Sequence, residues 1–141
     1  MRLDFYLSAR HPVERVLPAV AAKAREADHR LLVVSDDSEQ LDRLAAALWA
    51  YRPETFLANG RSGEPHAARQ PILLSAACEA ENGAGLIALA DGIWRPEAET
   101  FERVLLFFGE AGREAARAVW RQFDTREDVE RGFHDLDQRA S

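Results

Sequence analysis

The sequence predicts an α/β domain, in which a mostly parallel sheet alternates with helices that cover both of its faces. Two observations support this prediction. Five short apolar runs are separated by polar connections or by stretches with helical periodicity. One run, residues 31–35 (LLVVS), is apolar almost throughout, which is typical of a strand buried on both faces. The 141 residues are enough for one domain with a substantial core.

The first half of the chain is predicted as two strand–helix units. Residues 3–8 form the first strand, and residues 13–27 follow with apolar side chains at helical spacing. Pro18 requires that this helix either starts near residue 17 or bends. Residues 31–35 form the second strand, and Asp37 is the expected N-cap of the next helix. The buried stripe of that helix is Leu41, Leu44, Ala45, Leu48 and Trp49.

The second half is predicted as three further strands and one main helix. A long loop, residues 54–71, precedes strands at residues 72–74, 86–89 and 101–108. Gly109 then leads into a helix over residues 113–123. We expect the domain to cover residues 1–124, with residues 125–141 as an acidic tail. The helical spacing of Val129, Phe133 and Leu136 makes a short helix the expectation for part of this tail.

The composition limits the classes of function. The formal net charge is 18 − 24 = −6, so we expect no direct nucleic-acid binding. Cys78 is the only cysteine, which excludes an internal disulfide and a cysteine-based metal site. No stretch reaches the length of a membrane span and no export signal is visible, so a soluble cytoplasmic protein is expected.

Few residues suggest catalysis. Residues 83–88 (GAGLIA) match the letters of a dinucleotide-binding motif, but they precede a strand rather than following one. Asp36 and Asp37 follow the second strand, where a magnesium-dependent phosphohydrolase or a nucleotide-binding protein would place carboxylates. The alternative is that they cap the next helix, and we favour it. The four histidines are not at metal-ligand spacing, so we expect no metal, no cofactor and no catalytic residues.

The helix over residues 113–123 (REAARAVWRQF) carries the most distinctive pattern. Arg113, Arg117 and Arg121 are four residues apart, which stacks three guanidinium groups along one helix face. Trp120 lies on a neighbouring face. This arrangement suits an acidic group with an apolar neighbour, although a solvated surface would also explain it. A second apolar patch, Trp49, Tyr51, Pro53 and Phe56, surrounds the end of the preceding helix and suggests a partner site.

Several stretches resemble, in order and spacing, the chi subunit family of bacterial DNA polymerase III holoenzyme. They are LDFYLS, LDRLAAALWAYRPETF, QPILLS, FERVLLFF and REAARAVWRQF. The resemblance implies a Rossmann-like fold and a non-catalytic subunit of the clamp-loader complex. It also implies two partners, which are the acidic C-terminal tail of single-stranded DNA-binding protein and the psi subunit.

The resemblance also assigns residues to these two partners. Matching positions for the tail-binding pocket are Arg117, Trp120 and Arg121, with Phe107 and Phe108 nearby. By its charge and its place on the same helix, Arg113 is expected at the rim of this pocket, where it would meet acidic residues upstream of the peptide end. Matching positions for the psi interface are Trp49, Tyr51, Pro53 and Phe56. The chain departs from the family in two places. Ala58-Asn59 stands where the family has Pro-His, and the tail beyond Asp124 does not follow the family pattern.

Overall fold

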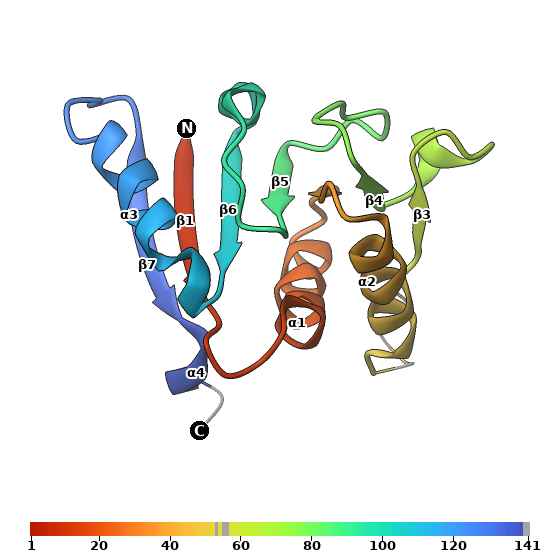
Figure 1. Ribbon diagram of the computed structural model, residues 1–141. Helices are drawn as coiled ribbons and strands as arrows, with labels where there is room; N and C mark the ends of the chain where they lie inside the picture. Colours follow the sequence, from red (N-terminus) through yellow and green to blue (C-terminus); the bar gives the residue numbers. More distant parts are fainter. Residues whose placement is uncertain (53, 55–56, 140–141) are drawn as a thin grey trace.

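The central strands of the sheet are the continuous apolar runs of the sequence. The computed structural model of the chain describes residues 1–52, 54 and 57–139. These residues form a seven-stranded sheet with the order β3-β4-β2-β5-β6-β1-β7, in which every neighbouring pair is parallel (Figure 1). The strands are β1 (Arg2–Leu7), β2 (Leu31–Val34), β3 (Asn59–Arg61), β4 (Ile72–Ser75), β5 (Leu86–Leu89), β6 (Arg103–Phe108) and β7 (Glu130–Asp135).

Helices cover both faces of this sheet, as predicted. The apolar stripes of α1 (Val13–Glu26) and α2 (Ser38–Ala50) pack on one face. The helix α3 (Arg113–Gln122) packs on the other face through Ala116, Val119 and the residue after its end, Phe123. The parallel α/β, Rossmann-like fold expected from the sequence is therefore confirmed.

Pro18 does not delay the start of α1. The helix begins at Val13, directly after Pro12 in its extended N-cap conformation, so of the two alternatives, a later start or a bend, the start near residue 17 is wrong. Pro18 lies early in the helix and is buried. There its missing N–H removes one hydrogen bond, to the carbonyl group four residues earlier.

The two edge strands were not predicted. The strand β3 (NGR) lies within the expected loop, and β7 (ERGFHD) lies within the expected tail. Phe133 is on β7 and not on a helix, and only the single turn α4 (Leu136–Arg139) follows. Edge strands are solvated on one side, so they lack the continuous apolar runs that identified the central strands.

Candidate functional site

The helix α3 presents three kinds of surface. It follows a short 3-10 turn, η4 (Glu110–Gly112), and its residues Ala116 and Val119 face the core. Trp120 is half-buried at the edge of that core, and Arg117 and Arg121 are exposed. The arginine spacing read from the sequence therefore places charged groups directly beside an aromatic ring.

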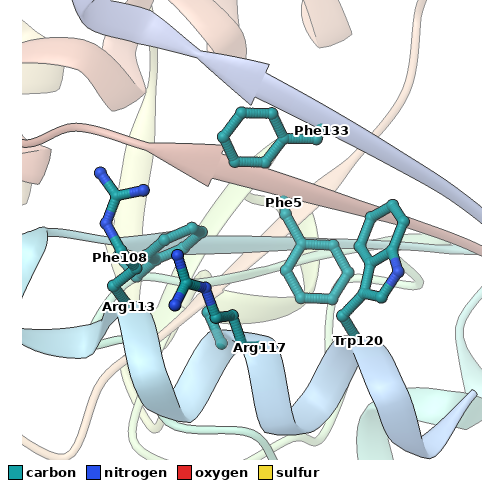
Figure 2. Close-up of a pocket in the computed structure, with 7 residues that line it drawn as sticks. Phe5, Phe108, Arg113, Arg117, Trp120 and Phe133 are labelled. Atoms are coloured by element: carbon teal, nitrogen blue, oxygen red, sulfur yellow. The ribbon is translucent and has the colours of Figure 1, made fainter.

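A pocket of about 290 Å³ lies between α3 and the sheet. Figure 2 shows Arg113 and Arg117 of α3 at one end, near Phe108 of β6, and the rings of Phe5 and Trp120 packed together at the other. The seven lining residues come from four elements and are Phe5, Phe108, Arg113, Ala116, Arg117, Trp120 and Phe133. The pocket therefore has an aromatic interior and a cationic rim.

Trp120 is held in place from two sides. Its ring lies 5.0 Å from the ring of Phe5, centroid to centroid, at an interplanar angle of 56°. The guanidinium of Arg131, on β7, lies 4.7 Å from the centroid of the Trp120 ring. The same guanidinium donates hydrogen bonds to the carbonyl oxygen of Trp120 and, at 2.8 Å, to the carboxylate of Asp124. These contacts fix the aromatic wall before any ligand arrives.

Within the described part of the chain, the arginines of the rim pair only with exposed carboxylates. Arg113 donates two hydrogen bonds, 2.9 and 3.0 Å long, to the carboxylate oxygens of Glu110. This contact lowers the pKa of Glu110 and raises the pKa of Arg113. Arg117 donates one bond of 3.2 Å to Glu114, and 58% of its side chain is exposed. Exposed pairs of this kind contribute roughly 0–1 kcal/mol, so a ligand carboxylate can replace them.

Comparison with known protein families decides which class of protein carries this pocket. Residues 1–129 match the family model described as DNA polymerase III chi subunit, HolC. The chain belongs to this family. The resemblance noted in the sequence is thereby confirmed, and members of the chi family are accessory subunits of DNA polymerase III. No curated protein is similar enough to this chi-family chain to count as a match.

The structure of this chi-family protein brings together four of the six residues expected at the pocket. They are Phe108, Arg113, Arg117 and Trp120. Phe107 is fully buried on the opposite face of the sheet, where its ring stacks 4.9 Å from the ring of Tyr6. Arg121 is exposed one turn beyond Arg117 and does not line the pocket.

Sequence reasoning missed three lining residues, Phe5, Ala116 and Phe133. Phe5 alternates with Leu3 and Leu7 on one face of β1, and this period-two pattern was the available signal. Phe133 lies on a strand that was expected to be helical or irregular, so no pattern pointed to it. It lies outside the residues that match the chi-family model.

The second expected partner surface lies at the other edge of the sheet. Trp49, near the end of α2, is 57% exposed. Tyr51 is half-buried, and the guanidinium of Arg52 lies 5.3 Å from the centroid of its ring. Pro53 and Phe56 lie outside the residues that the structure describes. The helix α2 packs beside β3 and β4, whereas α3 lies beside β7 and β1 (Figure 1).

The carboxylates after β2 have structural partners. Asp37 is the N-cap of α2 and accepts a 3.0 Å hydrogen bond from the backbone N–H of Glu39, which confirms the capping interpretation. Asp36 pairs with Arg95 at 3.0 Å. Arg95 in turn donates two hydrogen bonds, 2.9 and 2.8 Å long, to Asp91 at the end of the neighbouring strand β5.

The cluster of Asp36, Asp91 and Arg95 lies beyond the carboxyl ends of the neighbouring strands β2 and β5. Proteins with α/β folds often bind ligands at such a place. Burial raises the pKa of Asp91, but the hydrogen bonds from Arg95 and from the backbone N–H groups of Asp36 and Ile93, with the positive charge of Arg95, together outweigh burial, so the pKa lies below its ordinary value. Within the described ranges there is no group of three or more His, Cys, Asp or Glu side chains that could hold a metal ion. None of the helices described is long and apolar enough to span a membrane.

Proposed function

We propose that this chi-family protein is a non-catalytic adaptor that binds the acidic C-terminal tail of single-stranded DNA-binding protein between α3 and β7. In this proposal it links the tail to the clamp loader of DNA polymerase III through the psi subunit, in the cytoplasm. The observation that supports the proposal is a pocket with two arginines on its rim and four aromatic rings in its lining.

The chemistry of the pocket fits the end of such a peptide. A C-terminal apolar residue carries a carboxylate next to a side chain that needs burial. The guanidinium groups of Arg113 and Arg117 can each form a bidentate pair with a carboxylate. The rings of Phe5, Trp120 and Phe133 provide the apolar wall. The volume of about 290 Å³ is at the lower limit of ligand pockets, which suits one side chain better than a large cofactor.

Charge governs how the peptide approaches. Glu110 and Glu114 compete with the ligand for the two rim arginines. Arg121 forms no ion pair within the part of the chain that the structure describes. We therefore propose that Arg121 attracts acidic residues upstream of the peptide terminus, as a salt-sensitive steering charge outside the pocket.

The proposed psi contact uses the exposed ring of Trp49, together with Tyr51, Pro53 and Phe56. Because α2 and α3 lie toward opposite edges of the sheet, neither partner would cover the surface of the other (Figure 1). This separation supports a bridging role.

The proposal is tested with two arginine variants one helical turn apart. Calorimetric titration with an acidic peptide that ends in a free-carboxylate apolar residue is compared for wild type, Arg117→Ala and Arg121→Ala. We expect Arg117→Ala to cost about 1 kcal/mol or more, as for anchors in buried interfaces, and Arg121→Ala to cost less. Trp120→Ala is expected to cost at least as much as Arg117→Ala.

The thermal midpoint of each variant serves as the folding control. Among the residues that the structure describes, Arg117 has one ion pair, which is exposed, so its removal should leave the fold intact. Unchanged peptide affinity in a folded Arg117→Ala protein would refute the pocket as the binding site.

A further inference from the structure

The strand β7 is a free edge of the sheet. The other edge strand, β3, is only three residues long and packs against α2, where Arg61 pairs with Asp42 at 2.7 Å. By contrast, β7 has six residues and, among the described residues, pairs with β1 alone. An exposed edge strand offers unpaired N–H and C=O groups to any chain that can lie beside it.

The pairing register shows which groups of β7 are free. In a parallel pair, alternate residues of a strand direct both backbone groups toward one neighbour. The N–H of Glu130 donates to the carbonyl oxygen of Met1 at 3.1 Å, so Glu130, Gly132 and His134 face β1. The backbone groups of the three alternate residues therefore point outward, away from β1. These residues are Arg131, Phe133 and Asp135.

The free edge is continuous with the pocket. Phe133 contributes outward backbone groups and also a ring that is 54% exposed and lines the pocket. Figure 2 shows this ring across the pocket from Arg113 and Arg117 of α3. Of the two acidic residues of the edge, Glu130 pairs with Arg2 at 3.4 Å, and the charge of Asp135 contributes to the raised pKa of Arg113. Cationic side chains of α3 therefore flank one side of the edge.

We infer that the acidic peptide binds as an eighth strand along β7. Its backbone pairs with the outward groups of Arg131, Phe133 and Asp135. Alternate side chains of a strand point to opposite faces, so one peptide side chain enters the pocket beside Phe133 and its neighbours do not. The identity of this ligand rests on the proposed function, whereas the mode of binding rests on the free edge. The carboxylates on the α3 side face Arg113 and Arg117.

Amide hydrogen exchange, measured by NMR on the full chain, tests this inference. The probe is the acidic peptide with a free-carboxylate apolar end, added to saturation as judged by calorimetry. We expect the amides of Arg131, Phe133 and Asp135 to exchange roughly tenfold more slowly, or more, when the peptide is bound. The amides of Gly132 and His134, which already face β1, are the internal control and should change less.

Peptides methylated at single backbone nitrogens provide the matched control on the ligand. A strand directs every second amide toward its neighbour, so methylation should weaken binding at alternate positions only. Equal effects of methylation at all positions of the peptide would refute binding as an eighth strand. Outward amides of β7 that stay unprotected at saturation would refute it as well. Neither result would contradict the proposed function.

Two other outcomes also decide against the inference. A peptide that does not bind at all removes both the inference and the proposed function. Protection that rises with protein concentration in the absence of peptide identifies a second copy of this chain as the occupant of the edge, and so overturns the inference.

Discussion

Asp4 is a fully buried carboxylate that joins three strands. Its Oδ2 atom accepts hydrogen bonds from Nε of Arg103 on β6 at 2.7 Å and from Nε of Arg2 at 3.1 Å. Its Oδ1 atom lies 3.0 Å from Nε2 of His134 on β7. Replacing Asp4 by asparagine keeps the size of the side chain and removes its charge, so it tests how firmly β7 is attached.

The cost of Asp4→Asn can be estimated from these contacts. Leaving a buried charge without a partner costs about 3–5 kcal/mol, but Arg2 and Arg103 are 43% and 39% exposed and water can solvate them again. The loss should therefore be closer to that of one charge-assisted hydrogen bond, about 2 kcal/mol. For a chain of this size the thermal midpoint should fall by on the order of 8 °C.

The contribution of Asp4 to the free energy of unfolding depends on pH, and the direction of its pKa shift gives the sign of that dependence. Burial raises the pKa of Asp4, but hydrogen bonds from His134, Arg2 and Arg103 outweigh burial, so the pKa is lowered in the folded protein. The unfolded chain then binds the proton more tightly. The stabilisation is complete above the unfolded pKa of about 3.9 and is lost as the pH falls through the folded value.

Urea denaturation of wild type and Asp4→Asn at neutral pH and at about pH 3 measures both effects. We expect a large difference in unfolding free energy at neutral pH and a smaller one in acid. Asp42→Asn is the matched control, because Asp42 has one short ion pair but is 72% exposed, and it should cost well under about 1 kcal/mol. A cost of Asp4→Asn that does not change with pH would refute the charge argument.

Three further predictions concern the pocket, the second partner surface and the cap of α2. Glu114→Gln removes the carboxylate that competes for Arg117, so calorimetry should show severalfold tighter binding of the acidic peptide; weaker binding would contradict the competition. Trp49→Ala should abolish capture of psi in a pull-down while leaving peptide affinity unchanged, and joint loss of both would argue against separate surfaces. Asp37→Ala should lower the unfolding free energy in urea by about 1 kcal/mol, because Asp37 caps α2, and should leave peptide affinity unchanged; a neutral effect on stability would contradict the capping role.

The sequence predicted the central strands because burial on both faces demands apolar residues at consecutive positions. The edge strands β3 and β7 were not predicted, because half of each is solvated and their sequences, NGR and ERGFHD, show no strand periodicity. Pairing along the sheet, which no local pattern records, decides that such segments become strands.

The absence of strand pairing from local sequence patterns also explains which residues of the pocket were predicted correctly and which were not. Phe107 and Phe108 are neighbours in sequence, and only the register of β6 against β1 shows that Phe108 faces the pocket while Phe107 faces α1. The arginine spacing correctly placed Arg113 and Arg117 together, because helical period is a local property. Phe5 and Phe133 join them only through strand pairing over more than one hundred residues, since Phe5 lies opposite Phe133 in the register.

The pairing of β1 with β7 also constrains how the chain folds during synthesis. The strand β1 leaves the ribosome well before β7 (residues 130–135), which is one of its two neighbours in the sheet. Contacts between such distant segments form slowly and late. A nascent chain that has completed α3 still lacks Phe133, which completes the pocket lining. It also lacks Arg131, which holds the ring of Trp120. Chains that stop short of β7 should therefore be unable to bind the peptide, even when α3 has formed.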